Sequence, residues 1–515
     1  MSTIEHLSVN PNIQQRQAAS PEASVWVSAS AGTGKTKVLT DRVLSLLLTG
    51  TKPQRILCLT FTRAAAAEME SRIADQLGKW TMAAESDLRA ALEDLLGEAP
   101  DETRVQRARQ LFALVLDTPG GMNIQTIHAF CQSLLGRFPL EAGVPPHFAL
   151  MDERDAEEML IAAREELLNR ARNGADENLA GALAEVTAHI HETQFPDLLA
   201  ELTYARGRLR RLIESHGSID AVIKNLHQLL VVAPDETPTG VIAAASENAA
   251  LDEMGLRLAI AALSEGNEND DARGQRIQNW IDNPSRSSDA FFDYASIFLT
   301  DFTKGSFNVR KTLITKKPSE ASPGVKEILQ QEGERLERAI MHWRSVSVAK
   351  STSALLILGD ALLATYQAQK EAKALLDYED LILMAGELLH QPDVAPWVLF
   401  KLDGGIDHVL VDEAQDTSPD QWRVIEALAD EFFVGLSQHE TPPTIFAVGD
   451  VKQSIYSFQG ADPITFGAMR NLFATRAKDA QQVWRPVDLT VSFRSTQAVL
   501  QAVDAVFALP EAADG

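Results

Sequence analysis

The chain has 515 residues, and its content of 45% hydrophobic and 23% charged residues is ordinary for a soluble globular protein. At about 100–200 residues per domain, this length excludes a single hydrophobic core and predicts two to four domains. The formal net charge of −25 argues against a generally basic nucleic-acid binder, but salt screens charges beyond about 10 Å, so a local groove can still bind a polyanion.

The cysteine content and the N-terminal residues predict a cytoplasmic protein. Cys58 and Cys131 cannot build a disulfide framework or, by themselves, a cysteine-based metal site. The first residues, MSTIEHLSVNPNIQQ, have neither the basic start nor the apolar core of a signal peptide. We find no run of 18 or more apolar residues, so we expect no membrane span and no membrane partner.

The first 140 residues alternate strand and helix patterns, which is typical of a parallel α/β sheet. An apolar run precedes a glycine-rich loop, and the helical apolar spacing that follows ends at Gly50. The predicted elements are a strand at 23–30, a helix at 35–50, a strand at 54–62, a helix at 64–80, polar helical residues at 80–118, and a strand leading into a helix within 121–138.

The character of the chain changes between about 141 and 390. Long amphipathic helical patterns, such as 153–173 and 353–374, alternate with polar breaks. These breaks stand at 232–240, 264–274 and 316–324. We therefore expect a mostly helical domain that is inserted into the α/β domain.

Strand patterns return after residue 390. HVLVDEAQD (408–416) and TIFAVGD (444–450) are apolar strands that end in carboxylates. The last pattern, 485–509, is a strand followed by a helix, and it is expected to open another domain.

The stretch SASAGTGKTKVL (28–39) fits the phosphate-loop pattern, with Ala29 at a position usually held by glycine. Glycines let backbone amides turn inward at a helix start, where the helix dipole favours an anion. Lys35 would reach the β- and γ-phosphates of ATP, and Thr36 would ligate Mg²⁺. A glycine-rich connector is the alternative, but the preceding strand and following helix favour a nucleotide site. The predicted phosphate-binding residues are Ala29, Ser30, Ala31, Gly32, Thr33, Gly34, Lys35 and Thr36.

Asp412 and Glu413 stand at the end of a predicted strand, in LVDEAQ. Adjacent acids on a loop are usually solvated surface, but here they follow an apolar strand in a chain with a phosphate loop. Asp412 would hold Mg²⁺, and Glu413 would act as general base on the attacking water. The two patterns together predict an ATPase.

Five ordered stretches then give a specific resemblance. They are TFTRAAAAEMESRI (60–73), QTIHAFCQSLL (125–135), LVDEAQDTSPDQW (410–422), AVGDVKQSIYSFQGADP (447–463) and LTVSFRST (489–496). Together they resemble the motif series of superfamily 1A helicases, the group of UvrD, PcrA, Rep and RecB. The resemblance covers roughly 1–140 and 390–510, and the inserted region matches only loosely.

The resemblance implies an α/β, P-loop NTPase (RecA-like) fold with four segments. They are the first part of motor domain 1A (1–140), an inserted helical domain 1B (141–390), the second part of domain 1A (391–484) and the start of a second RecA-like domain 2A (485–515).

Within this group the chain is most similar to the AddA type, the helicase-nuclease subunits of bacterial double-strand-break repair complexes. WVSASAGTGKT, FLTDFTKGSFNVRKTLITKKPSEASPG and VGDVKQSIYSFQGADP carry this similarity, and Gln459 stands where UvrD and Rep typically have arginine. The resemblance implies an ATP-dependent helicase that moves 3′ to 5′ on single-stranded DNA in double-strand-break repair and recombination. It also implies DNA ends and an AddB-like partner, in a heterodimer.

The same resemblance assigns further nucleotide-binding positions. Gln15 would read the adenine edge, although Gln14 and Gln17 are alternative registers. Lys37 and Phe493 would sandwich the adenine ring, where the family usually has arginine and tyrosine. Near the γ-phosphate it places Gln415, Gln453 and Arg494, the arginine crossing the cleft from the second domain. The implied catalytic set is Lys35, Asp412, Glu413, Gln453 and Arg494.

For DNA, the resemblance implies aromatic stacking, which tolerates any base sequence. Phe61, Tyr456 and Phe458 match the stacking positions, although Phe61 could instead pack in the core. The positions matching the phosphate track are Thr60, Thr62, Arg63, Thr126 and His128, the last of which could be purely structural. The basic residues Lys304, Arg310, Lys311, Lys316 and Lys317 could contact duplex DNA or the partner, or form a solvated loop.

The family's motifs V and VI and the RecB-type nuclease domain do not occur before Gly515. We therefore expect the N-terminal part of a longer protein, in which nucleotide binding survives better than motor activity. Two alternatives stay open at this point. One is a UvrD- or Rep-like repair or replication helicase without a nuclease, and the other is a fragment that binds nucleotide or DNA without unwinding.

Overall fold

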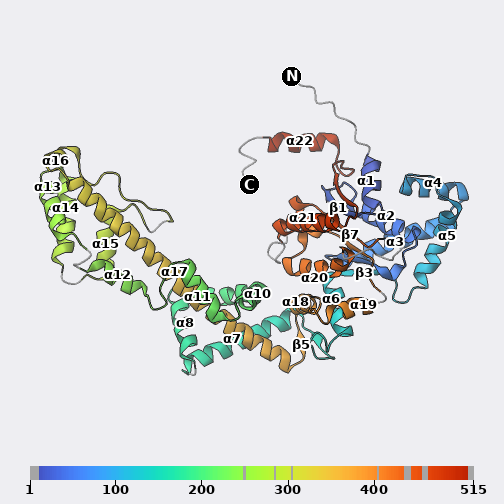
Figure 1. The fold of residues 1–515 in the computed structure, drawn as a ribbon, viewed down its shortest axis with the longest axis horizontal. Helices are drawn as coiled ribbons and strands as arrows, with labels where there is room; N and C mark the ends of the chain where they lie inside the picture. Colours follow the sequence, from blue (N-terminus) through green and yellow to red (C-terminus); the bar gives the residue numbers. More distant parts are fainter. Residues whose placement is uncertain are drawn as a thin grey trace, which may run out of the picture. The chain divides into compact units, whose positions relative to one another are not determined.

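The computed structural model describes residues 11–174, 176–247, 251–283, 286–302, 305–402, 405–433, 442–454 and 462–508. The chain forms two compact units. Unit 1 consists of Met1–Asp152 and Glu371–Gly515, and unit 2 of Glu153–Lys370. Unit 1 contains the sheet, and unit 2 is helical (Figure 1).

The sheet of unit 1 has six strands, all parallel, in the order β3-β2-β6-β7-β1-β8. The strands are β1 (Ser24–Ala29), β2 (Ile56–Thr60), β3 (Asn123–Thr126), β6 (His408–Val411), β7 (Thr444–Gly449) and β8 (Trp484–Leu489). The α/β P-loop NTPase fold predicted from the sequence is confirmed. The apolar strands are buried because helices cover both faces of the sheet.

Successive side chains of a strand point to opposite faces, and each face has its own core. On β1, Val25 and Val27 join one core while Trp26 joins the other. The first core holds α1 (Pro11–Ala19), α2 (Lys35–Leu48), α3 (Arg63–Met82), α4 (Glu85–Leu96) and α5 (Glu102–Leu116). The second holds α6 (Ile127–Arg137), α18 (Tyr378–Leu388), α19 (Ala395–Lys401), α20 (Pro419–Asp430) and α21 (Pro463–Asp479).

The start of a second domain at residue 485 was expected, but β8 belongs to the first sheet. It pairs in parallel with β1 along its whole length, from Ser24↔Trp484 to Ala29↔Leu489. The expectation is wrong for these residues because a strand pattern does not say which sheet receives the strand. The helix that follows, α22 (Gln497–Phe507), buries none of its residues.

The inserted region is also shorter than the expected 141–390. Residues 141–152 and 371–390 belong to unit 1. There, β4 (Ala149–Leu150) pairs with β5 (Leu375–Leu376), and α18 packs its apolar residues into the core that contains α6 and α20. An apolar helix reads the same whether it lies in an inserted domain or under a sheet, so the sequence misplaced this boundary.

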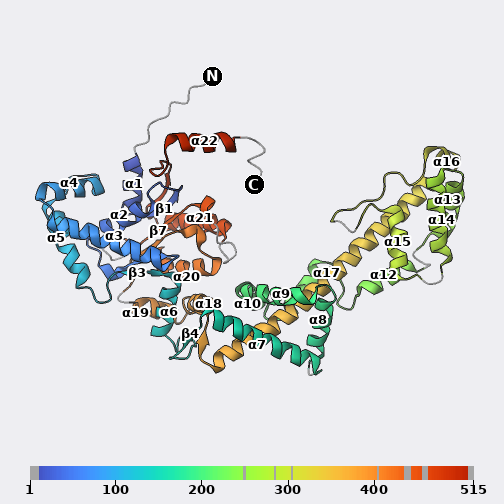
Figure 2. The same cartoon turned by 180° about the vertical axis from the view of Figure 1, so that it is seen from behind.

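Unit 2 is built on α17 (Val325–Ala372), a helix of 48 residues (Figure 2). The N-terminal part of α17 shares a core with α12–α15, and in its C-terminal part Gly359 lies against Leu202 and Leu209. The other helices are α7 (Glu153–Arg172), α8 (Glu177–Thr187), α9 (Phe195–Tyr204), α10 (Arg206–His216), α11 (Ile219–Leu229), α12 (Pro238–Ser246), α13 (Glu253–Ser264), α14 (Glu268–Asp282), α15 (Ser288–Phe298) and α16 (Lys316–Ala321).

One expected break in this unit is wrong. Residues 264–274 were read as a polar break, but α14 begins at Glu268. Asn267 caps this helix by accepting a hydrogen bond from the N–H of Asp270, and the acids of its first turn suit the helix dipole. Polar composition alone therefore concealed a helix start.

Among the described residues, α17 is the one helix that is long and apolar enough to cross a membrane by length and composition. An 18-residue window in it has a mean hydropathy of 1.5, and 33% of that window is buried. A core helix of a soluble protein passes the same test, so this finding is weak evidence for a membrane span.

Candidate nucleotide-binding and hydrolysis site

Three strands of the sheet end beside one another at its carboxyl edge. β7 lies between β1 and β6, so the loop after β1, the acids after β6 and Asp450 after β7 meet there. In parallel α/β sheets, ligands bind outside the carboxyl ends of the strands. The two patterns that were singled out from the sequence therefore lie in one place.

The loop between β1 and α2 turns on two glycines. Gly32 and Gly34 have φ values of 75° and 91°, which side chains rarely adopt. The buried Thr33 fixes the turn because its hydroxyl donates to the carbonyl of Ser30 over 2.8 Å. Gly34 provides no side-chain cap for α2. The free amides at this helix start therefore suit an anion such as a phosphate.

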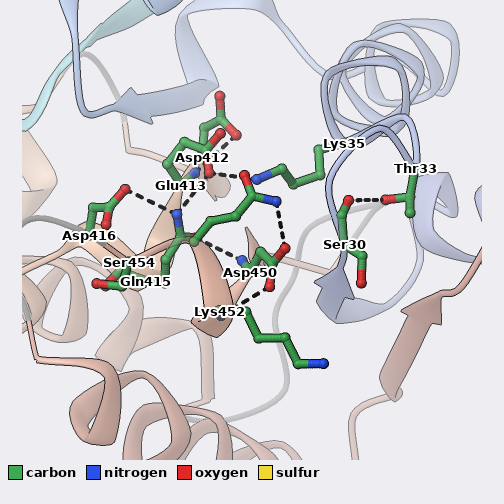
Figure 3. A network of polar contacts seen from close by, with 11 residues as sticks. Ser30, Thr33, Lys35, Asp412, Glu413, Gln415, Asp416, Asp450, Lys452 and Ser454 are labelled. Carbon is green, nitrogen blue, oxygen red and sulfur yellow. Dashed lines mark hydrogen bonds and ion pairs between the residues drawn. The ribbon is translucent and has the colours of Figure 1, made fainter. Parts of the chain in front are cut away.

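Glu413 has a strained backbone at the point where it meets the loop. Its φ and ψ are both 45°, a left-handed conformation in a residue that is not glycine. Its Oε2 accepts a hydrogen bond from Nζ of Lys35 over 2.7 Å (Figure 3). The Lys35 side chain is 12% exposed and that of Glu413 is 37% exposed, so water still reaches this carboxylate.

Gln415 is a buried hub behind Glu413 (Figure 3). Its Nε2 donates to Oε2 of Glu413 over 2.9 Å and to Oδ2 of Asp416 over 3.0 Å. Its Oε1 accepts from the N–H of Asp450 over 2.9 Å. Gln453 donates in turn to the carboxylate of Asp450 over 2.6 Å. A continuous chain of hydrogen bonds thus runs from Lys35 to Gln453.

Asp450 and Asp416 were not given roles from the sequence. Asp450 had a signal, because TIFAVGD is an apolar strand that ends in a carboxylate and lies beside β1. Asp416 is buried, and burial raises the pKa of its carboxyl, with the charge of Glu413 adding to the effect. Its contact with Gln415 depends on the 3₁₀ turn Ala414–Asp416, which no periodicity in the sequence indicates.

Asp412 and Thr36 fit a magnesium ion. Burial raises the pKa of the Asp412 carboxyl to about 6, and the neighbouring Glu413 charge adds to this, so a cation there would offset two crowded acids. Thr36 lies in the first turn of α2, next to Lys35. No cluster of three or more His, Cys, Asp or Glu side chains exists within the described ranges. Magnesium at nucleotide sites commonly needs only one or two protein ligands besides phosphates and water.

The residues predicted for the adenine lie next to the loop. Among the candidate glutamines, Gln15 is the buried one; its Nε2 is 3.5 Å from the carbonyl oxygen of Thr33, and it would be 3.0 Å from a Cβ at Gly34. Lys37 forms an ion pair with Asp41 over 2.6 Å. The ring of Phe493 is 61% exposed.

The residues predicted for DNA lie at the ends of two adjacent strands. β2 and β3 pair at Thr60↔Thr126, which brings 60–63 beside 126–128. Two of the hydroxyls already cap helices: Thr62 accepts from the N–H of Ala65, and Thr126 from the N–H of Ala129. The hydroxyl of Thr60 donates to the carbonyl of Thr62. Phe61 is half-buried and Arg63 exposed, whereas Tyr456 and Phe458 lie outside the described residues.

His128 has a partner that the sequence did not indicate. Its ring meets the edge of Tyr378, at the start of α18, with centroids 5.6 Å apart. Burial lowers the pKa of His128, so its imidazole favours the neutral form. In the predicted basic segment, Arg310 donates to the carbonyl of Ser296 and Lys316 pairs with Glu320, while Lys304 lies outside the described residues.

Replacing Thr126 by alanine is expected to lower the free energy of unfolding of unit 1 by about 1 kcal/mol, because α6 loses its N-cap. Denaturant unfolding of the protein measures this change. Thr126→Ser keeps the hydroxyl and is expected to unfold like the wild type. Equal stability of the alanine and serine variants would mean that the cap contributes nothing.

The fold and its glycine-turned loop define the class of protein, an α/β P-loop NTPase. The sequence model described as UvrD/REP helicase N-terminal domain matches residues 10–474, and the chain belongs to this family.

Curated relatives carry a more particular name, that of the AddA-type subunit of an ATP-dependent helicase/nuclease. The relative from Latilactobacillus sakei is 27% identical over 97% of this chain and 55% of its own length. Those from Pelotomaculum thermopropionicum and Geobacillus thermodenitrificans are also 27% identical, over 94% and 96% of this chain but only 37% and 39% of their own lengths. The resemblance to AddA-type proteins is confirmed. The chain spans between about a third and a half of these relatives.

Proposed function

We propose that this chain carries the nucleotide site of an ATP-dependent DNA helicase, in which ATP hydrolysis between the phosphate loop and Glu413 drives movement along single-stranded DNA. The observation that carries the proposal is the approach of Lys35 to Glu413 at the carboxyl edge of the sheet, over 2.7 Å. Family membership supports it, because a UvrD/REP helicase domain matches most of the chain.

In this proposal the phosphate loop binds ATP through its turned amides, and Lys35 leaves Glu413 for the β- and γ-phosphates. Glu413 then accepts a proton from a water molecule whose oxygen attacks the γ-phosphorus. The bond from that phosphorus to the bridging oxygen breaks, and ADP and phosphate are released. Gln415 holds Glu413 in place through the 2.9 Å hydrogen bond.

Thr36 and Asp412 would hold Mg²⁺, which when bound neutralises charge that develops on the phosphates. Arg494 would add a positive charge at the γ-phosphate. Gln15, Lys37 and Phe493 would contact the adenine. The proximity of Gln15 to Gly34 supports this assignment, because the same helix then touches both base and loop.

We place the DNA track along the ends of β2 and β3, where Phe61 would stack on bases and Arg63 would contact phosphates. The hydroxyls of Thr62 and Thr126 cap helices, so their role in the proposal is chiefly to hold the strand ends in shape. Tyr456 and Phe458 remain candidate stacking residues.

The biological setting follows from the relatives. Their printed name describes one subunit of a helicase/nuclease, which supports a second activity in the whole protein and a partner protein. We propose action on DNA ends in double-strand-break repair and recombination, with 3′ to 5′ movement, an AddB-like partner and a cytoplasmic location. This setting is favoured over a UvrD- or Rep-like helicase without a nuclease, because several relatives share the name.

Single-stranded DNA is expected to raise the ATP turnover of the full-length protein several-fold, because binding along the track closes the site that Gln415 and Gln453 connect to it. The measurement is steady-state phosphate release with and without a mixed-sequence oligonucleotide. Blunt duplex DNA and RNA of the same sequence are the controls. Turnover that none of these changes would contradict the proposed motor, and displacement of a strand from 5′-tailed but not 3′-tailed duplex would reverse the polarity.

A further inference from the structure

The segment that follows β8 lies against the phosphate loop. β8 and β1 are adjacent parallel strands that end together, at Leu489 and Ala29. The phosphate loop continues from one strand and residues 490–496 continue from the other. The two stretches therefore leave the sheet side by side, at the edge where the nucleotide site lies.

Two hydrogen bonds join this segment to the loop. The N–H of Phe493 donates to the carbonyl of Gly32 over 2.8 Å. The hydroxyl of Ser492 donates to the carbonyl of Ala31 over 3.2 Å. Both acceptors are main-chain groups of the loop, so the contact does not use the amides that would bind phosphate.

Gly32 makes this contact possible. A Cβ at this position would lie 2.4 Å from Cβ of Arg494 and 3.0 Å from Oγ of Ser492. Gly32 also has a φ of 75°, so both its conformation and its missing side chain suit the approach of the segment. The backbone of Arg494 thus packs directly on the phosphate loop, within unit 1. The sequence had suggested instead that this arginine approaches from a second domain.

Little else fixes this segment. The helix that follows it, α22, has no buried residue, and the Phe493 ring is 61% exposed. The Arg494 side chain is exposed and forms no hydrogen bond or ion pair with the part of the chain that the structure describes. The end of β8 and the two loop contacts therefore determine where residues 492–494 lie.

We propose that Ser492 is a positioning residue of the hydrolytic site, whose hydroxyl fastens residues 492–494 to the phosphate loop so that Arg494 is held beside the bound nucleotide. This inference rests on the proposed function, because it requires ATP in the loop. A segment that is already anchored loses less freedom when it meets the phosphates than a free one. The anchor also lets a change in the loop move Arg494 directly.

The test is a double-mutant cycle in the full-length protein. Ser492→Ala is expected to lower kcat for ATP hydrolysis about fivefold, the effect of one neutral hydrogen bond, with KM for ATP unchanged. Ser492→Thr keeps the hydroxyl and is expected to restore kcat. Ser495→Ala is the matched control, since Ser495 is a half-buried serine of the same segment without a contact to the loop.

The cycle combines Ser492→Ala with Arg494→Ala. If Ser492 acts through Arg494, the serine substitution is expected to lower kcat no further when the arginine is already absent. An equal fivefold loss in both backgrounds would overturn the positioning role. So would a Ser492→Ala enzyme with the kcat of the Ser495→Ala control.

Hydrogen exchange supplies a measurement that needs no hydrolysis. Deuterium uptake by peptides covering 490–496 is expected to rise in Ser492→Ala and not in Ser495→Ala, because the Phe493 amide loses protection. Absence of ATP hydrolysis in the wild type would contradict the proposed function but leave this readout intact. Unchanged uptake in Ser492→Ala would overturn the anchor itself.

Discussion

Replacing Glu413 by glutamine is expected to lower ATP turnover by about 10²–10⁴-fold, the usual contribution of a general base. Glutamine keeps the size of the side chain but cannot accept a proton from water. It can still accept the hydrogen bond that Gln415 donates to Glu413. ATP binding is expected to hold or improve, because the substitution removes the ion pair that engages Lys35 over 2.7 Å.

Single-turnover hydrolysis and equilibrium binding of ATP measure the two effects separately. Glu431→Gln is a suitable control, since Glu431 is an exposed acid at the end of α20, away from the phosphate loop. Turnover within threefold of the wild type, with unchanged binding, would show that Glu413 is not the base. Loss of binding together with turnover would assign it a role in holding the loop.

The local elements of the nucleotide site could be predicted from the sequence. The strand, loop and helix around Lys35 follow from an apolar run, two glycines and helical apolar spacing. The placement of Asp412 follows from an apolar strand that ends in a carboxylate. In each case neighbouring residues determine the structure, so a pattern of a few residues is sufficient.

The rest of the site depends on contacts between distant residues. Nothing within 484–489 indicates that this strand pairs with β1, so the sequence could not place Ser492 and Arg494 on the phosphate loop. The left-handed backbone of Glu413 is imposed by its surroundings, because nothing in a glutamate favours it. The hydrogen bond from Asp450 to Gln415 joins two strand ends 35 residues apart.

Replacing Lys35 by alanine is expected to weaken ATP binding by about 10–100-fold, since a hydrogen bond to a charged group contributes about 1.5–3 kcal/mol. Hydrolysis is expected to fall further than binding, because the ammonium also stabilises charge that develops on the γ-phosphate. The free energy of unfolding is expected to change by less than about 1 kcal/mol. The carboxylate partner is 37% exposed, and pairs that water reaches contribute little to stability.

Titration calorimetry with ATP, phosphate release and denaturant unfolding separate these three effects. Lys52→Ala is the matched control, because Lys52 is an exposed lysine beyond the other end of α2. A large loss of stability in Lys35→Ala would mean that the ion pair with Glu413 serves the fold rather than the reaction. Unchanged ATP affinity would remove the phosphate loop from the site. The expected pattern, weak binding in a stable protein, requires that Lys35 be held by Glu413 only until the phosphates replace it.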